Sequence, residues 1–210
     1  MADQSLFEQI ANDIYTQGFS VRENALPPAL ATALAAQVRG LSGESFSRAG
    51  IGRQDDHLKT DEIRRDEISW IDDKSAAGVA WQAWTGELQA VMNRRLFLGL
   101  FSFESHFAHY APGDFYKRHL DAFRGQQNRV LTVVTYLNPD WQQEYGGELL
   151  IYPEDGAEPM LHVTPDFGTL VVFLSEEFPH EVLPAARDRY SIAGWYRINS
   201  SVSDRVDPAS

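Results

Sequence analysis

The chain has 210 residues, and its 43% hydrophobic and 12% aromatic content is enough for a sizeable core, which excludes an intrinsically disordered polypeptide. Its net charge of −12 disfavours non-specific binding to nucleic acids and anionic membranes, because phosphate groups require a positive field. The chain has no cysteine, which excludes disulfides, thiolate catalysis, iron–sulfur clusters and cysteine-based zinc sites and agrees with a reducing cytoplasm.

The first half of the chain is predicted to be largely helical. Apolar residues recur at the spacing of one helix face in three segments. Pro27 and Pro28 open the second, and Ser75 is the expected N-cap of the third. We interpret these apolar stripes as core-packing faces. The predicted helices cover 5–17, 27–41 and roughly 76–96, and short strands are predicted at 19–21 and 68–71.

Residues 42–67 lack a clear apolar period and are rich in glycine and charge. A loop of this length inside a compact domain is either functional or a solvated insertion. The functional interpretation is a mobile substrate-covering loop, with Arg64 and Asp66 as ordering contacts. The residues alone do not decide between the two.

From residue 103 onward, short segments rich in β-branched and aromatic residues follow each other, separated by turn signals such as Gly146-Gly147. No helical pattern intervenes, so parallel βαβ units are excluded, and about eight short strands imply a sandwich or jelly-roll barrel. We predict one mainly β domain over 1–198: N-terminal helices (1–41) on one outer face, the 42–67 loop and a jelly-roll core (103–198), before a disordered tail (199–210). The strands are predicted at 103–111, 115–121, 129–138, 147–152, 159–163, 168–174, 180–183 and 189–198.

His119 and Asp121 are the first candidates for chemistry. They lie two residues apart in the predicted strand 115–121, so their side chains should point to the same face. His180, after the apolar strand 168–174, supplies a second imidazole. Two imidazoles and one carboxylate on one face of an octahedron bind Fe(II) and leave three positions open. A His-x-Asp pair alone is a weak signal, but this ordered set is a much stronger one.

Arg189 follows His180 by nine residues. If strands 180–183 and 189–198 are neighbours, its guanidinium returns toward the cavity that holds His180. The open metal positions suit a 2-oxo acid and dioxygen, and a dicarboxylate co-substrate needs a cation at its far end. Arginine matches a carboxylate bidentately, and Tyr136 offers a further hydroxyl donor.

Two interpretations other than an Fe(II) site that uses a 2-oxo acid and dioxygen stay open. One is a cupin-like module that holds a metal without turnover, although such a module has no need for an anchor like Arg189 with Tyr136. The other is a hydrolytic zinc site, since zinc also accepts two histidines and a carboxylate. That site would want a general base, and none is identified.

These motifs carry a specific resemblance over roughly residues 45 to 198. The chain resembles the 2-oxoglutarate- and Fe(II)-dependent oxygenases, within them the prolyl 4-hydroxylase group, and most closely the prolyl hydroxylase domain enzymes and their bacterial relatives. Residues Arg64 to Trp70 are similar to the strands that flank the mobile substrate loop of those enzymes. The other matching segments are Tyr110-Ala111-Pro112-Gly113, Tyr116 to Asp121, Arg129, Tyr136-Leu137-Asn138, Asp140-Trp141, Gly146 to Leu149, Pro179 to Val182, Arg189-Tyr190 and Trp195-Tyr196.

The resemblance implies a double-stranded β-helix, which is a cupin-like jelly roll, and a site within it. It implies iron at His119, Asp121 and His180, and the distal carboxylate of 2-oxoglutarate at Arg189 with Tyr136. Tyr110 is expected near the metal-binding end of the co-substrate, and Leu149 and Trp195 should wall the pocket. One departure is Ala193, where the family often carries a hydroxyl residue.

The implied reaction uses Fe(II), 2-oxoglutarate and O2, with ascorbate as a possible addition, and hydroxylates a prolyl residue of a protein, giving succinate and CO2. Elongation factor Tu is a candidate substrate by resemblance only, and an oxygen-sensing or translation-related role stays open. A free amino acid or another small molecule is the alternative substrate. A nucleic-acid demethylase is disfavoured by the charge of −12. We expect a cytoplasmic monomer with no nucleic-acid or membrane partner.

Overall fold

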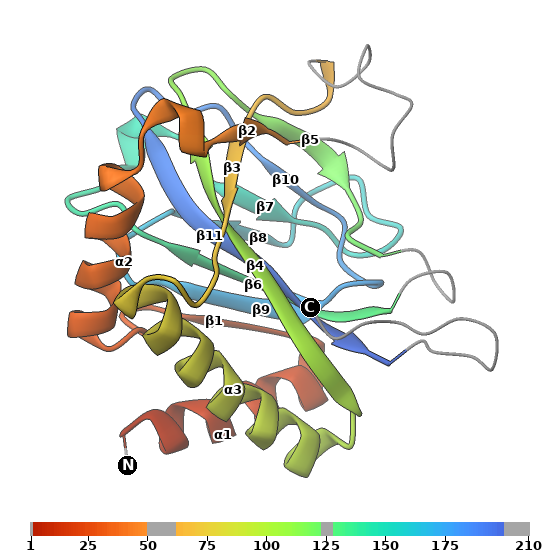
Figure 1. Cartoon of the computed structure of the whole chain (residues 1–210). Coiled ribbons are helices and arrows are strands. Elements are labelled where there is room, and N and C mark those ends of the chain that lie inside the picture. The colour runs from red at the N-terminus through yellow and green to blue at the C-terminus, as the bar shows by residue number, and fades with distance from the viewer. Residues whose placement is uncertain (1, 50–61, 123–127, 200–210) are drawn as a thin grey trace, which may run out of the picture.

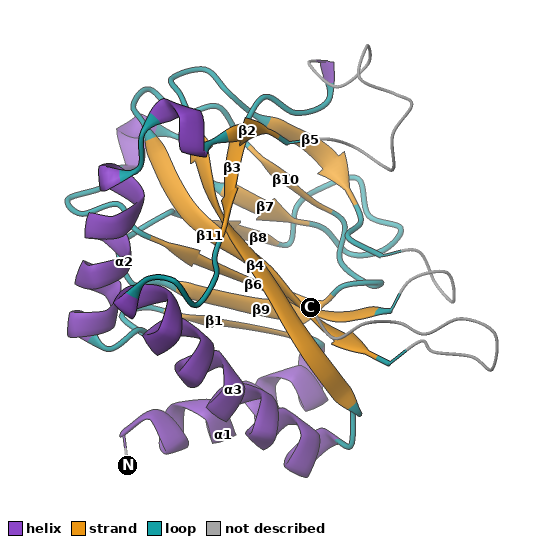
Figure 2. Cartoon of the chain, in the orientation of Figure 1, coloured by secondary structure: helices purple, strands orange, loops and turns teal. Residues whose placement is uncertain are grey.

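The computed structural model describes residues 2–49, 62–122 and 128–199 (Figure 1). Residues 50–61 of the predicted loop 42–67, and all but the first residue of the predicted tail 199–210, lie outside these residues. Helices gather on one side of the molecule and strands form the rest (Figure 2). No helix in the described ranges is long and apolar enough to cross a membrane.

Seven antiparallel strands form the larger sheet, in the order β1-β9-β6-β11-β4-β3-β2. Its centre is the long pair β4 and β11, which stay paired from Arg189 opposite Tyr110 to Ile198 opposite Leu100. The strands are β1 (Phe19–Arg22), β2 (Ser47–Arg48), β3 (Glu67–Trp70), β4 (Leu100–Tyr110), β6 (Arg129–Tyr136), β9 (Leu170–Leu174) and β11 (Arg189–Ile198).

Four antiparallel strands form the smaller sheet, in the order β5-β10-β7-β8. The smaller sheet faces the larger one, and the second half of the chain thus forms the predicted jelly roll. The strands are β5 (Tyr116–His119), β7 (Leu149–Ile151), β8 (Leu161–Val163) and β10 (His180–Val182).

Three helices cover the outer face of the larger sheet: α1 (Ala2–Gln17), α2 (Pro28–Gly40) and α3 (Ala76–Leu96). Ser75 caps α3 as predicted, because its hydroxyl accepts a hydrogen bond from the Gly78 amide. Short 3₁₀ helices lie at Gly43–Ser45 and Gln143–Tyr145.

Strand alternation divides the interior into two apolar clusters. Leu131 and Val133 of β6 point to the helices, whereas Val134 and Tyr136 point between the sheets. We call the first the helix-side cluster, which includes Phe7, Trp81 and Leu88, and the second the inter-sheet cluster, which includes Tyr110, Tyr136, Leu149, Ile151, Phe173 and Val182. The inter-sheet cluster is the one that borders the candidate site.

Two expectations about strands are wrong. Strand 115–121 is shorter than predicted, because β5 ends at His119 and Asp121 lies in the bend that follows. Residues 180–183 and 189–198 are not neighbours, since β10 lies between β5 and β7 whereas β11 lies between β6 and β4. Arg189 and His180 both border the space between the sheets, because the chain crosses from one sheet to the facing one.

Candidate metal centre

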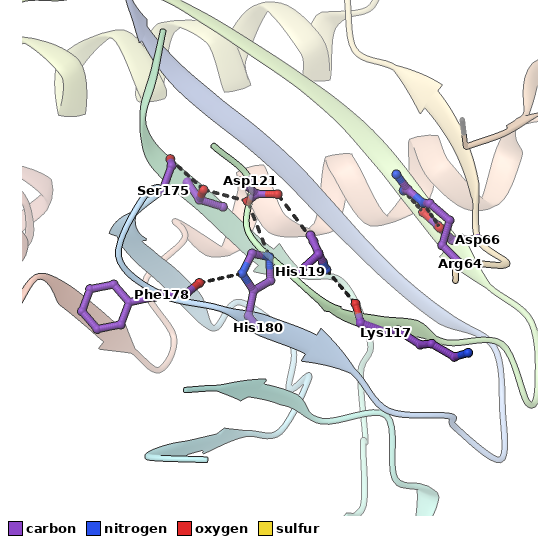
Figure 3. A network of polar contacts seen from close by, with 9 residues as sticks. Arg64, Asp66, Lys117, His119, Asp121, Ser175, Phe178 and His180 are labelled. Carbon is purple, nitrogen blue, oxygen red and sulfur yellow. Dashed lines mark hydrogen bonds and ion pairs between the residues drawn. The ribbon is translucent and has the colours of Figure 1, made fainter. Parts of the chain in front are cut away.

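His119, Asp121 and His180 converge in the space between the two sheets (Figure 3). His119 ends β5 and His180 begins β10, and the two residues are direct partners in the smaller sheet. Asp121 reaches the same space from the bend after β5. One ligand atom of each residue lies within 4.8 Å of the others, so the three could hold a metal ion.

The main chain fixes both imidazoles in the same way. His119 Nδ1 lies 2.9 Å from the Lys117 carbonyl, and His180 Nδ1 lies 3.0 Å from the Phe178 carbonyl. A carbonyl can only accept, so each Nδ1 carries a proton, and in a neutral imidazole the lone pair then lies on Nε2. Both Nε2 atoms lie 3.5 Å from an oxygen of Asp121, one on each oxygen, which is too long for a good hydrogen bond. This orientation of the second nitrogen is typical of metal-binding histidines.

The charge states of the three residues suit metal binding. Burial of the Asp121 carboxylate would raise its pKa, but the adjacent His180 and His119 hold that pKa well below its usual range. Burial, together with the neighbouring His119, lowers the pKa of His180 to about 4. Near neutral pH the site therefore offers a carboxylate and a neutral imidazole, the forms in which these groups coordinate metals.

Arg189 and Tyr136 form a buried polar pair in the same inter-sheet space. The Arg189 guanidinium is 1% exposed; its Nε donates to the Gly147 carbonyl at 2.8 Å and its Nη1 to Ser191 Oγ at 3.3 Å. Its Nη2 and the Tyr136 hydroxyl have no hydrogen-bond partner among the described residues. Burial raises the pKa of Tyr136 to about 12, so the phenol keeps its proton and can donate. A buried cation with two unused donors is the arrangement that a carboxylate would complete.

The other predicted pocket residues surround these groups. Tyr110 and Leu149 are buried in the inter-sheet cluster, and the Tyr110 ring centroid lies 5.0 Å from Arg189 Cζ. Trp195 lies on β11 opposite Thr132, and the Arg129 guanidinium stacks over its ring at 3.8 Å. Tyr110 thus lies beside Arg189, whereas Trp195 lies six residues further along β11, opposite Thr132.

Arg64 and Asp66 form a bidentate ion pair at the end of the 42–67 segment. Arg64 Nε and Nη2 donate to the two Asp66 oxygens at 2.7 and 2.6 Å, and Asp66 is only 1% exposed. Burial would lower the pKa of Arg64, but Asp66 holds it above its usual value. The guanidinium lies 4.3 Å from the Tyr116 ring centroid, and Tyr116 stacks on His119 at 3.5 Å between centroids. The pair is therefore linked to the three clustered residues through one aromatic ring.

Two polar residues beside Asp121 are absent from the sequence prediction. Thr132 Oγ1 lies 2.8 Å from Asp121 Oδ2 and 2.9 Å from Ser175 Oγ. Thr132 shares the inward face of β6 with Tyr136, four residues away, so strand alternation could have identified it. Ser175 follows β9 in a turn and carries no such signal.

The donor set and the paired Arg189 and Tyr136 agree with the chemistry of a known family. The sequence model described as the 2OG-Fe(II) oxygenase superfamily matches residues 105–197, the region that contains all of these groups except Arg64 and Asp66.

Solved structures extend this similarity to nearly the whole chain. A prolyl-4-hydroxylase from Pseudomonas putida is 42% identical with a TM-score of 0.82, and the match covers 92% of this chain and 100% of that one. A Trichoplax adhaerens prolyl hydroxylase, solved in complex with a hypoxia inducible factor peptide fragment, is 30% identical with a TM-score of 0.82 over 93% and 90% of the two chains. Rat Egl nine homolog 1 is 42% identical over 86 residues, 40% of this chain, which spans only 25% of that relative's length.

Proposed function

Because the chain belongs to the 2-oxoglutarate- and Fe(II)-dependent oxygenase superfamily, we propose that it hydroxylates a prolyl residue of a protein substrate, converting 2-oxoglutarate and O2 to succinate and CO2. The observation that carries this proposal is one inter-sheet space that holds both a two-histidine, one-carboxylate cluster and a buried arginine with an unused donor. The proposal is supported by two prolyl hydroxylases of solved structure, whose matches cover 92% and 93% of this chain.

His119, Asp121 and His180 are the proposed iron ligands. Two imidazole nitrogens and one carboxylate oxygen form the facial set that suits Fe(II) in oxygenases and leaves coordination positions open. Bound there, the iron would supply the activation of O2 for hydroxylation. The chain itself contributes the orientation: the Lys117 and Phe178 carbonyls hold both imidazoles with Nε2 toward the carboxylate.

Arg189 and Tyr136 are the proposed anchor for the distal carboxylate of 2-oxoglutarate. The unpaired Nη2 and the unpaired phenol support this assignment, since each is buried and each can donate. Tyr110 would lie near the end of the co-substrate that approaches the metal, and Leu149 and Trp195 would wall the pocket. Because these groups are buried, they would exclude water from a bound co-substrate.

A protein substrate is favoured over a free amino acid by the surroundings of Arg64 and Asp66. The main chain next to this ion pair bridges to β5, because the Lys117 amide donates to the Ile63 carbonyl at 2.8 Å and the Arg65 amide to the Phe115 carbonyl at 3.1 Å. The end of the 42–67 loop is thus attached to β5, two residues from the proposed metal ligand His119. We infer that the loop closes over a peptide, with Arg64 and Asp66 ordering its end.

The finer assignments rest on the family resemblance and on composition. Elongation factor Tu is a candidate substrate, and ascorbate is a proposed reductant that keeps the iron in its ferrous form. The lack of cysteine makes a reducing compartment such as the cytoplasm the proposed location.

The test is to incubate the purified protein with Fe(II), 2-oxoglutarate and a cell lysate. We expect 2-oxoglutarate-dependent succinate formation and a mass increase of one oxygen atom on proline in one or a few proteins. A parallel incubation with free proline tests the alternative that the substrate is a free amino acid. The His119→Ala variant should lose succinate formation, whereas His162→Ala, on an exposed position of β8, should retain it. Succinate formation that survives in His119→Ala would contradict the ligand assignment.

A further inference from the structure

Two buried hydroxyl groups connect Asp121 to the larger sheet. Thr132 Oγ1 lies 2.8 Å from Asp121 Oδ2 and Ser175 Oγ lies 2.9 Å from Thr132 Oγ1. Thr132 is 1% exposed and Ser175 is 0% exposed, so neither hydroxyl exchanges its partner for bulk solvent.

The chemistry of the three groups fixes the direction of both hydrogen bonds. An ionised carboxylate has no proton, so it can only accept, and Thr132 must donate to Asp121. Thr132 has one proton and has used it, so it accepts from Ser175. The order is therefore Ser175 to Thr132 to Asp121, and each bond polarises the next, which makes Thr132 a stronger donor than an isolated hydroxyl.

The position of Asp121 explains why such a contact is needed. The residue lies beyond the end of β5, so the ladder that fixes His119 and His180 does not hold its backbone. Thr132 belongs to β6 in the facing sheet, and Ser175 begins the turn that leads from β9 to His180. The two hydroxyls thus tie Asp121 to the larger sheet and to the segment that carries His180.

We propose that Thr132 and Ser175 are positioning residues that fix the rotation of the Asp121 carboxylate, so that the oxygen facing His119 is aligned for the metal. The inference rests on the proposed function, in which Asp121 is an iron ligand. Neither hydroxyl touches the reacting atoms, and both act through Asp121. Loss of such a contact to a ligand typically weakens metal affinity by about 10- to 100-fold.

The test compares metal binding by four variants of the full chain, with Mn(II) as the probe titrated by electron paramagnetic resonance. Thr132→Val removes the donor at nearly constant shape, and Thr132→Ser restores it. Thr135→Val is the matched control, because Thr135 is equally buried on the same strand but points to the other face and donates to the Thr169 carbonyl. Ser175→Ala removes only the outer hydroxyl.

We expect Thr132→Val to raise the Mn(II) dissociation constant by about tenfold or more. The dissociation constants of Thr132→Ser and Thr135→Val should stay near that of the parent. The constant of Ser175→Ala should lie between those of the parent and Thr132→Val. With Co(II) as the probe, the visible spectrum should change in Thr132→Val and not in Thr135→Val, which separates a ligand effect from a general loss of stability.

Several results would overturn the proposal. Equal Mn(II) affinity in the parent and Thr132→Val would exclude the positioning role, as would equal losses in Thr132→Val and Thr135→Val. Should Thr132→Val fail to fold, the comparison of Ser175→Ala with Thr135→Val decides, and equal affinities there refute the role. His119→Ala separates the two levels of inference: if it leaves Mn(II) affinity unchanged, the metal site itself is wrong, whereas a loss there with none in Thr132→Val refutes only the role of Thr132.

Discussion

At the scale of single residues, unused hydrogen-bonding atoms are the most informative feature of the site. A buried donor without a partner costs about 1–3 kcal/mol, and native proteins contain few of them. Arg189 Nη2 and the Tyr136 hydroxyl occur together, and Arg189 Cζ lies 5.0 Å from the Tyr136 ring centroid. Two such atoms next to each other indicate a site whose partner arrives with a ligand, which is why the pair favours a dicarboxylate co-substrate over simple metal storage.

Tyr136→Phe tests this interpretation. It removes a hydroxyl that has no partner among the described residues, so the unfolding temperature of the ligand-free protein should not fall. The affinity for 2-oxoglutarate, measured by calorimetry with Mn(II) present, should drop by about 1.5–3 kcal/mol, the usual range for a hydrogen bond to a charged group.

Tyr196→Phe is the matched control for this prediction. Its hydroxyl is equally buried, but it belongs to the helix-side cluster and donates to the Thr85 carbonyl at 2.7 Å. Tyr196→Phe should therefore lower stability by about 0.5–1.5 kcal/mol and leave the 2-oxoglutarate affinity unchanged. If 2-oxoglutarate affinity fell in Tyr196→Phe and not in Tyr136→Phe, the role of Tyr136 in binding the co-substrate would be refuted.

Part of the site could be predicted from these residues in the sequence, and part could not. His119, Asp121 and His180 carry their chemistry in their identity, and their predicted clustering is what the structure shows. The Arg64–Asp66 ion pair was expected only as an ordering contact, and its stacking on Tyr116 depends on a pairing between distant segments. Thr132 and Ser175 are ordinary hydroxyl residues, so only three-dimensional proximity to Asp121 distinguishes them.

At the scale of elements, the pairing of β4 with β11 determines where the site residues lie. Arg189 and Trp195 share the inward face of β11, whereas Gly194 points to the helices. A Cβ on Gly194 would lie 2.6 Å from the Phe103 ring and 2.9 Å from the Glu104 carbonyl oxygen. The glycine therefore permits the close approach of β11 to β4 directly beside Trp195.

Gly194→Ala should destabilise the protein by about 1–3 kcal/mol, because backbone as well as a ring must move. Gly86→Ala, on the exposed face of α3, introduces the same methyl group with no atom within 4 Å. That change should stabilise by about 0.5–1 kcal/mol, since alanine loses less conformational freedom in a helix. Chemical denaturation of both variants measures the change in the free energy of unfolding. A change of the same sign in both would contradict this account of the β4–β11 contact.

Strand order was the least predictable property of the elements. The sequence pattern located all eight strands of the core, because apolar alternation and turn residues are local signals. Pairing is not local, so β10 and β11 could be read as neighbours although they lie in different sheets. The end of β5 at His119 was also missed, since the alternation of His119, Leu120 and Asp121 continues past the last strand hydrogen bonds.

At the scale of the whole molecule, the larger sheet separates two interiors with different tasks. The helix-side cluster contains residues such as Leu88, Trp81 and Ile192 and has no candidate site residue. The inter-sheet cluster borders the candidate ligands, since the Phe173 ring lies 4.9 Å from the His180 ring. This division predicts that global stability and ligand affinity can be changed independently.

Leu88→Ala tests that independence. Leu88 is fully buried between α3 and the sheet, so its truncation should cost about 2–5 kcal/mol of stability. At a temperature where the variant is folded, its affinities for Mn(II) and 2-oxoglutarate should equal those of the parent, because no candidate ligand contacts this cluster within the described residues.

The double variant Leu88→Ala/Tyr136→Phe extends this prediction, since the effects of substitutions at distant sites without shared partners add within about 0.5 kcal/mol. Its stability should match Leu88→Ala and its 2-oxoglutarate affinity should match Tyr136→Phe. A coupling larger than this in either measurement would mean that the sheet transmits strain between its faces, and that the helical layer tunes the site rather than only supporting it.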